Sequence, residues 1–419
     1  MSRWVPGAAA LAVAVLLGPG AQGQETAFRG HVKLQQQYVA ADARSVEAAL
    51  GYRQSRETSL DLRLIGTHAA GRFRFDAAYL LRADVDDAVA LMRRLRVLRP
   101  ALSLDRTDTA WLGLDDPLAN RKEMRAVQSL DRLSVSYTTE RWVFALGRQA
   151  YTWGNGIVFR PLDLFDPFAP DAVDESYKPG VDALYAQRLF ADGSDLTTLI
   201  VPRRNPATGA LDPDFGSAAV KWHGAGAGVQ LEIVAARDYG DTVLGLGLAG
   251  AWDGAVWRVT LVPERLVSGH TKTSLVANVE HAWQRGERNL SGFAEYYRNG
   301  FGRSGSGYAL DELDADLLAR LARGQVFDTG RDYVALGLRM QLTPLLEVDP
   351  VLIANLGDHS RLLLLQGNWS VAQNLGLDFG VRAAVGATGT EFGGLRVSAG
   401  SAVLEAPAAR FYMRLARYF

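Results

Sequence analysis

Apolar and polar side chains alternate along most of this chain with a period of two residues. Leu60, Leu62 and Leu64 alternate with Asp61 and Arg63, and the same pattern returns in many later segments. Successive side chains of a β-strand point to opposite faces. The pattern therefore predicts an all-β chain whose strands each have one apolar and one polar face.

The pattern divides the chain into eighteen expected strands. They cover residues 27–40, 57–69, 71–82, 128–139, 141–149, 180–190, 194–202, 214–223, 226–238, 241–249, 251–263, 271–284, 287–299, 331–343, 345–356, 360–370, 373–385 and 408–419. Two segments between strands, 88–98 and 309–321, have apolar residues at helical spacing. We expect short helices there, capping the sheet or gating it.

The connections between these strands alternate between short and long. Joins after even-numbered strands are short, whereas joins after odd-numbered strands include every long one: 41–56, 83–127, 150–179, 300–330 and 386–407. Short turns at one end and long loops at the other are typical of transmembrane antiparallel β-barrels, with the turns periplasmic and the loops extracellular. Because two joins, near Asp241 and Gly357, are short, sixteen strands is the alternative count. A soluble sandwich or a multi-domain protein also alternates.

The beginning of the chain reads as a secretory signal peptide over residues 1–23. Arg3 precedes an apolar stretch of ten residues, 8–17, and a small-x-small site follows at 21–23. A membrane-spanning helix needs about 20 apolar residues, which neither this stretch nor any later one supplies. A closed barrel, in which every backbone polar group is paired within the protein, remains as the way to cross a membrane. We expect one domain over residues 24–419.

Composition removes several classes of function. The chain has no cysteine, so disulfides and thiol chemistry are excluded. Its formal net charge of −1 gives no reason to expect a nucleic-acid partner. The six histidines form no paired metal motif, and no Gly-x-Ser-x-Gly elbow is present. We therefore expect no enzyme, no metal and no cofactor, although a serine and a histidine that meet across strands stay open as an alternative.

The last strand resembles the terminal strand of Gram-negative outer-membrane β-barrels. Phe411, Met413 and Leu415 alternate with polar groups, and the chain ends on Phe419, although Arg417 stands where that family usually has an apolar residue. The resemblance implies a location in the outer membrane, contact with its lipid and lipopolysaccharide, and recognition of the final aromatic by the barrel-assembly machinery.

The polar faces of the expected strands carry more basic than acidic residues. Eleven basic residues compare with five acidic ones, Asp61, Asp76, Glu280, Glu295 and Asp378. The basic set is Arg29, Lys33, Arg63, Arg72, Arg74, Arg132, Arg258, Lys272, Arg339, Arg382 and Arg414. Arginine rings in a low-dielectric wall favour anions. The alternative is that these arginines only neutralise carboxylates on neighbouring strands.

The segment 147–180 is the least strand-like part of the chain. Four prolines within it restrict the backbone, and Gly154 and Gly156 permit a tight turn, so we expect an ordered loop. Its Gly-Arg-Gln…Trp-Gly-x-Gly pattern is similar to the strand end of alginate-export-type porins. We expect the loop to narrow the pore, with solute contacts from Arg148, Trp153, Asn155, Arg160 and Asp163. A rigid lid on the rim is the alternative, and calcium binding by its carboxylates is a weaker one.

These observations predict an outer-membrane channel or export porin that passes small, anionic solutes. The predicted pore-lining residues are the five loop residues together with Arg63, Arg72, Arg74, Arg132, Arg258, Lys272, Arg339 and Arg382. The alternative function is a non-conducting barrel that acts as a structural or assembly partner in the outer membrane.

Overall fold

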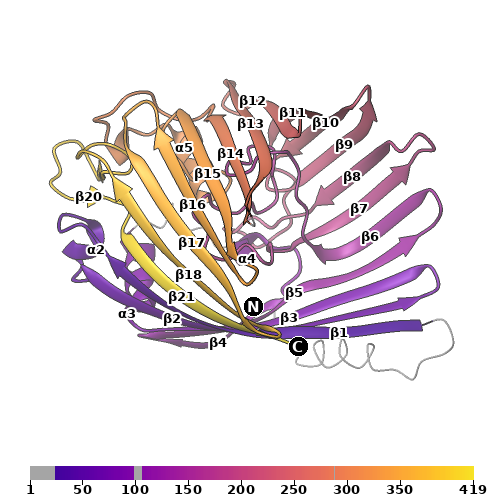
Figure 1. The fold of residues 1–419 in the computed structure, drawn as a ribbon, viewed down its shortest axis with the longest axis horizontal. Helices are drawn as coiled ribbons and strands as arrows, with labels where there is room; N and C mark the ends of the chain where they lie inside the picture. The colour runs from indigo at the N-terminus through magenta and orange to yellow at the C-terminus, as the bar shows by residue number, and fades with distance from the viewer. Residues whose placement is uncertain (1–23, 99–105, 287) are drawn as a thin grey trace.

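A computed structural model describes residues 24–98, 106–286 and 288–419. Within these residues, nineteen strands form one antiparallel sheet, and eighteen of them close into a ring (Figure 1). The expected signal peptide, 1–23, lies outside the described residues. The eighteen strands confirm the predicted count and exclude both the sixteen-strand barrel and the sandwich.

The strands of the ring follow one another in chain order. They are β1 (Gln24–Ala40), β2 (Gln54–Ala70), β3 (Phe73–Val85), β5 (Met124–Thr138), β6 (Trp142–Gln149), β7 (Val181–Leu189), β8 (Asp195–Val201), β9 (Ser217–Gly226), β10 (Val229–Asp238), β11 (Asp241–Trp252), β12 (Ala255–Arg265), β13 (Thr271–Arg285), β14 (Arg288–Arg298), β15 (Asp332–Thr343), β16 (Leu346–Asn355), β17 (Arg361–Ala372), β18 (Leu375–Val385) and β21 (Ala409–Tyr418).

The ring closes where the first strand meets the last. Leu34 of β1 pairs with Leu415 of β21, and the indigo and yellow strands lie side by side in Figure 1. The amide of Phe419 donates to the carbonyl of Gly30 at 3.0 Å, and the amide of Gly30 donates back at 2.8 Å. With this pair made, no edge of the ring is left open, as a sheet that crosses lipid requires.

The two faces of the ring differ as the alternation predicts. Leu34, Leu336 and Met413 are 50 %, 46 % and 43 % exposed on the outer face. On the inner face of the same region, Lys33 and Arg414 are only 3 % and 7 % exposed, although they are charged. Charged residues buried to that degree need partners, and these come from the interior of the ring.

The long connections carry the remaining elements. They are α2 (Val46–Ala49), α3 (Asp87–Leu98), α4 (Arg106–Thr109), β4 (Asp115–Arg121), η2 (Leu310–Glu312), α5 (Ala315–Ala322), β19 (Leu395–Arg396) and β20 (Leu404–Glu405). Helices at 88–98 and 309–321 were expected, and the second is interrupted at Leu313 and Asp314, where the backbone is extended. No helix among the described residues combines the length and the apolar character needed to span a bilayer.

Three strands were not expected: β4, and the two-residue strands β19 and β20 in the predicted loop 386–407. The segment 83–127 was predicted as a loop, but β4 lies within it and pairs with β5 alone. Its sequence, Asp115 to Arg121, lacks alternating apolar residues, and Pro117 coincides with a shift of register in the pairing. Proline at an irregularity of an edge strand is ordinary, but the sequence pattern gives no signal for it.

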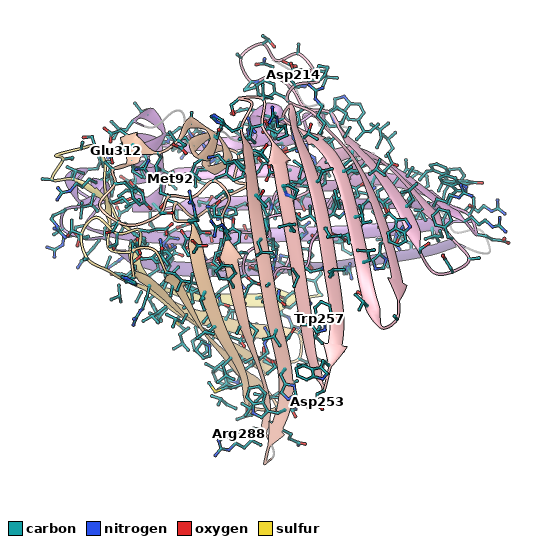
Figure 2. All side chains as sticks on the ribbon, turned by 90° about the horizontal axis from the view of Figure 1, so that it is seen from above. Met92, Asp214, Asp253, Trp257, Arg288 and Glu312 are labelled. Carbon is teal, nitrogen blue, oxygen red and sulfur yellow. The ribbon has the colours of Figure 1, made fainter. Side chains whose placement is uncertain are left out.

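Short turns and long connections lie at opposite ends of the ring. Figure 2 shows Asp253 and Arg288 at the tips of short hairpins, far from Met92 and Glu312 in the long connections. We call these the short-turn end and the long-loop end. The lengths of the joins predicted this arrangement, with the short turns at one end and the long loops at the other.

Candidate pore constriction and lumen

The connection between β6 and β7, residues 150–180, folds into the ring and touches its wall on several sides. Asp174 of this loop lies 2.6 Å from the ammonium of Lys33 on β1. The amide of Phe159, also in the loop, donates to Glu295 on β14 at 2.8 Å. Since β1 and β14 belong to well-separated parts of the ring, the loop crosses the lumen.

Glu295 holds the middle of the loop. Its carboxylate accepts hydrogen bonds from the amides of Ile157 (2.6 Å), Val158 (2.9 Å) and Phe159 (2.8 Å). The side chain of Asn278, on β13, donates to Glu295 at 3.0 Å and to the carbonyl of Asn155 at 3.1 Å. Three backbone amides on one buried carboxylate fix the position of the loop at this point.

Two apolar clusters attach the loop to the inner wall. In the first, Trp153, Leu162 and Phe165 pack against wall residues that include Val234, Val243 and Val262. In the second, Phe159 stacks on Tyr297 with ring centroids 4.5 Å apart and also packs near Tyr333.

Gly245 on β11 makes the first of these contacts possible. A Cβ atom at this position would lie 2.4 Å from Cδ1 of Leu162, a side chain that is completely buried. Because Gly245 has no side chain, the wall leaves room at this point for Leu162 of the loop.

A buried ion pair closes the loop on itself. The ammonium of Lys178 lies 2.5 Å and 2.6 Å from the carboxylate oxygens of Asp163. Burial raises the pKa of Asp163 to about 6, against the opposing effect of Lys178. Burial also lowers the pKa of Lys178. For Asp163 and for Lys178, the loss of hydration therefore disfavours the charged form more than the charge of the partner favours it.

The second half of the loop is held by charge. Asp171 pairs with Arg382 on β18. Asp174 pairs with Lys33 and, at 3.2 Å, with Arg414 on β21. Burial works to raise the pKa of Asp174, but Arg414 and the hydrogen bond from Lys33 outweigh it, so that this pKa lies well below its usual range.

The structure places the five predicted loop residues in different surroundings. Trp153 is buried at the wall, Asn155 lines a recess beside it, and Asp163 is occupied by Lys178. Arg160 is half-buried and pairs with Glu175 at 3.4 Å. Arg148 lies at the end of β6 and is buried, 2.7 Å from both Asp115 and Asp182, so its guanidinium is engaged within the wall.

A backbone irregularity explains the position of Arg148. Gly147, the residue before it, has a φ of 119°, a value that L-residues rarely adopt. A Cβ at Gly147 would lie 2.1 Å from the carbonyl oxygen of Leu133. The strict alternation of β6 therefore ends at Gly147, and the face of the following side chain cannot be read from parity.

Seven of the eight predicted wall residues pair with carboxylates of the protein, and four of these seven lie away from the short-turn end. Arg63 and Arg132 both pair with Asp131, and Arg382 pairs with Asp171. Lys272, at the long-loop end, lies 3.6 Å from Asp314. Asp131 and the loop carboxylates were not in the predicted acidic set. The predicted excess of eleven basic over five acidic residues is largely neutralised by them.

The other four lie toward the short-turn end, where the lumen is open to solvent. Arg72 is exposed in the turn before β3. Arg74 pairs with Asp76, and its side chain is 59 % exposed against 30 % for the carboxylate. Arg339 is 62 % exposed and pairs with Asp349, which is 14 % exposed. Arg258 pairs with Glu280, but here the arginine is the less exposed partner: its side chain is 25 % exposed, against 43 % for the carboxylate.

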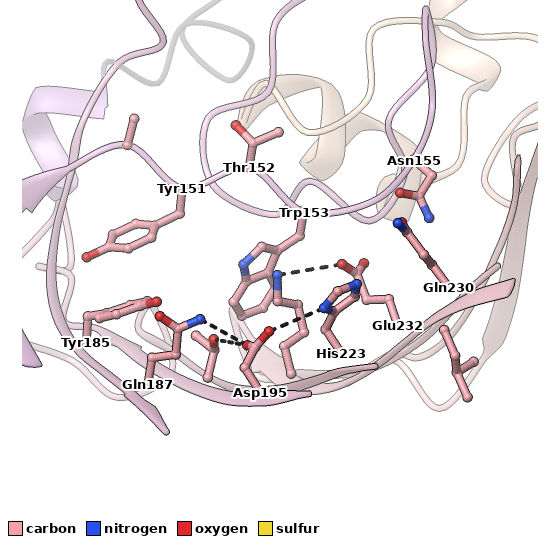
Figure 3. A pocket seen from close by; sticks show the side chains of 14 residues that line it. Tyr151, Thr152, Trp153, Asn155, Tyr185, Gln187, Asp195, His223, Gln230 and Glu232 are labelled. Carbon is pink, nitrogen blue, oxygen red and sulfur yellow. Dashed lines mark hydrogen bonds and ion pairs between the residues drawn. The ribbon is translucent and has the colours of Figure 1, made fainter. Parts of the chain in front are cut away.

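Sequence analysis missed a polar recess between the loop and the strands β7 to β10 (Figure 3). Its acidic and basic residues are Asp195, Lys221, His223 and Glu232, none of which was in the predicted lumen set. The signal was present in the chain, because Lys221, His223 and Glu232 interrupt otherwise apolar strand segments.

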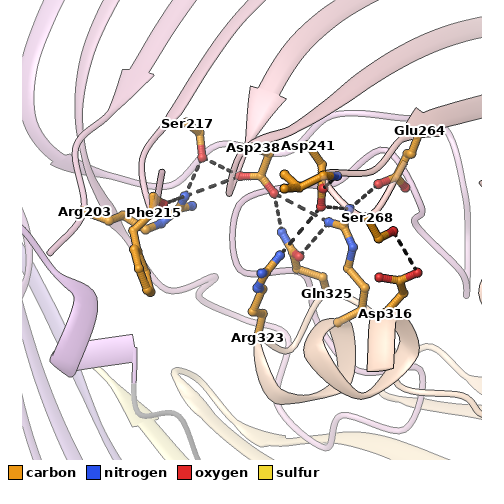
Figure 4. A network of polar contacts seen from close by, with 12 residues as sticks. Arg203, Phe215, Ser217, Asp238, Asp241, Glu264, Ser268, Asp316, Arg323 and Gln325 are labelled. Carbon is orange, nitrogen blue, oxygen red and sulfur yellow. Dashed lines mark hydrogen bonds and ion pairs between the residues drawn. The ribbon is translucent and has the colours of Figure 1, made fainter. Parts of the chain in front are cut away.

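The connection between β14 and β15 is pinned to the rim at the long-loop end (Figure 4). Arg320 of α5 lies 2.5 Å from Glu264 and 2.9 Å from Asp241. Gln325 donates to Asp238 at 2.7 Å. The described residues contain no cluster of three or more His, Asp or Glu side chains suited to a metal ion.

Comparison with known proteins rests on structure alone. No family model and no curated protein matches the sequence. The chain is similar to solved outer-membrane porins: OccAB3 of Acinetobacter baumannii (TM-score 0.55, 10 % identity, 94 % of this chain and 99 % of that chain) and OccAB2 of the same organism (0.53, 10 %, 94 % and 98 %). OpdQ of Pseudomonas aeruginosa is similar at a TM-score of 0.50 and 8 % identity, over 94 % and 97 % of the two chains. At such low identity, the likeness shows the fold, which is that of a porin-like barrel.

Proposed function

We propose that this protein is a passive, non-enzymatic channel of the outer membrane that passes small solutes, with the loop 150–180 as its constriction. The observation that carries the proposal is the combination of a closed ring, an apolar outer face and a loop fixed inside the lumen by Glu295. A barrel of this size can enclose an aqueous path, and a loop folded into it limits the size of the solute.

We further propose that the channel prefers anions. In the solvated half of the lumen, Arg74 and Arg339 are more exposed than the carboxylates that pair with them. A solute at this surface meets guanidinium groups first, and low-dielectric walls strengthen their field. A passive channel follows the gradient of its solute, so export and uptake are both compatible with this proposal.

A second candidate function is a non-conducting barrel that serves as a structural or assembly partner. The contacts of the loop favour it, because Lys33, Glu295, Arg382 and Arg414 hold the loop from several sides of the ring. Such contacts suit a plug as well as a constriction.

Swelling of liposomes that contain the purified protein separates the two candidates. The channel proposal expects uptake of small sugars and anions, with a cutoff by size. Correct insertion without uptake of any of them would favour the non-conducting barrel.

We propose two kinds of partner for the surfaces outside the lumen. The outer face, with exposed residues such as Leu246 and Leu365, suits outer-membrane lipid and lipopolysaccharide. The strand β21 and Phe419 are proposed as the element that the barrel-assembly machinery recognises. Replacement of Phe419 by Ser should lower the amount of folded protein in the outer membrane, and an unchanged amount would contradict this assignment.

A further inference from the structure

The recess beside Trp153 has the size and shape of a small-molecule site. It has a volume of about 390 Å³, within the usual range of roughly 300–1,000 Å³ for such sites. The loop residues Tyr151, Thr152, Trp153 and Asn155 form one side. The inner faces of β7 to β10 form the other. We call this cavity the Trp153 recess.

The recess opens toward the short-turn end of the lumen. Asp195 is the first residue of β8, and Gln230 follows the turn between β9 and β10 by two residues. Gln187 and His223 are likewise within a few residues of short turns. The loop covers the recess on the side toward the long-loop end, so a solute reaches it from the solvated half of the lumen.

The acidic and basic side chains of the recess contact each other in pairs. His223 lies 3.3 Å from Asp195, which also accepts hydrogen bonds from Gln187 (3.1 Å) and Thr197 (3.2 Å). Lys221 lies 3.6 Å from Glu232. An anionic ligand would have to displace a carboxylate from one of these pairs, at the cost of leaving that carboxylate unmatched. A neutral ligand would leave both pairs intact.

The groups that remain are suited to hydroxyl groups and to an apolar ring face. Gln187, Gln230 and Asn155 offer amide donors and acceptors, and carboxylate oxygens with free lone pairs accept further hydrogen bonds. Tyr151 stacks on Tyr185 with centroids 5.6 Å apart, which presents aromatic surface at one end.

Tyr151 also carries an unpaired hydroxyl group. Its hydroxyl is buried and has no hydrogen-bond partner in the protein. Burial raises the pKa of this phenol, so the group stays protonated. A buried donor without a partner is costly unless a ligand or water satisfies it.

We propose that the Trp153 recess binds a neutral polyhydroxy solute of monosaccharide size. The amides and the carboxylates receive its hydroxyl groups, and Tyr151 and Tyr185 contact its apolar face. This goes beyond the proposed channel function, because the recess would give the lumen a saturable site for a class of solute that the exposed arginines do not select.

Binding can be measured on the folded protein in detergent micelles by saturation-transfer NMR, with glucose as the probe and gluconate and glycine as charged and zwitterionic comparisons. We expect glucose to bind more tightly than either. The double variant Gln187→Ala, Gln230→Ala removes two hydrogen-bonding amides and should lower the affinity for glucose by about tenfold or more. The matched control is Gln341→Ala, Gln366→Ala, which removes two lumen amides on β15 and β17 and should change nothing.

Two results would overturn the proposal: glucose that binds equally to the double variant, or glucose that fails to bind. The single variant Gln230→Ala, with an exposed side chain, keeps the test available if the double variant does not fold. Because binding in micelles requires no conduction, a failure here is distinct from a failure of the channel proposal.

Discussion

Oε1 of Glu295 lies 2.8 Å from the amide nitrogen of Phe159, and it joins a strand on one side of the ring to a loop that begins on another. The same carboxylate also accepts the amides of Ile157 and Val158. This contact fixes the loop where it crosses the lumen, and the predictions below concern what that loop and its surroundings do.

Replacement of Glu295 by Ala should release the loop from β14. Three amides would lose their acceptor, and we expect a loss of about 2–4 kcal/mol in the stability of the docked loop. Hydrogen exchange at residues 157–159, measured in micelles, should accelerate strongly. Glu280→Ala is the control, because that carboxylate is 43 % exposed and pairs only at the open end of the lumen. Equal exchange in the two variants would contradict the anchoring role.

The pair of Asp163 and Lys178 should make loop docking depend on pH. The pKa of Asp163 in the folded protein is about 6, above its usual value of about 4. The folded state therefore binds the proton more tightly than the unfolded state. The contribution of protonated Asp163 to the stability of the folded state is fully present below pH 4 and is lost as the pH rises through 6. The loss is at most about 3 kcal/mol.

Asp163→Asn should remove this dependence between pH 4 and pH 6. Denaturation midpoints of the two proteins over that range provide the measurement. A wild-type midpoint that rises from pH 4 to pH 6, with the same slope in the variant, would show that Asp163 does not titrate as its burial requires.

Arg74 and Arg339 should set the anion preference of the lumen. Their replacement by Ala removes two exposed guanidinium groups from the solvated half of the lumen. We expect the ratio of anion to cation permeability to fall by about threefold. Reversal potentials under a salt gradient report it. The control pair Arg56→Ala, Arg237→Ala removes the same charge from the outer face of β2 and β10. An equal shift in both pairs would count against a lumen effect.

A larger side chain at Gly245 should lower the stability of the protein while Leu162 is present. Gly245→Val places atoms within 2.4 Å of Leu162, and overpacking of this kind costs about 1–3 kcal/mol. Urea unfolding followed by gel mobility measures the loss. Leu162→Ala in the same chain should recover part of it, and Gly226→Val, at a position with no atoms within 4 Å of its Cβ, should cost less. If Leu162→Ala recovers none of the lost stability, the cost of Gly245→Val comes from the strand itself and not from the contact with Leu162.

The sequence was sufficient for the ring and insufficient for what fills it. Alternation is a local property, so Leu60 to Leu64 reveal their strand without any partner, and eighteen such segments specify the barrel. Ion pairs are not local. Lys33 and Asp174 are 141 residues apart, and only the folded loop brings them together.

The same limit explains the individual site residues. Arg148 follows a glycine that breaks the alternation, so parity could not place it. Lys221, His223 and Glu232 lie on predicted strands, but the recess that they line exists only because the loop covers it. Charge counts along strands therefore overestimate the free positive charge of a lumen whose loop supplies the matching carboxylates.

Single-channel recording in planar bilayers tests the central claim most directly. The wild-type protein should give small, discrete conductance steps, and Glu295→Ala should give larger steps because the loop no longer narrows the lumen. Folded, inserted protein that gives no steps in either form would contradict the account of this barrel as a channel constricted by its own loop.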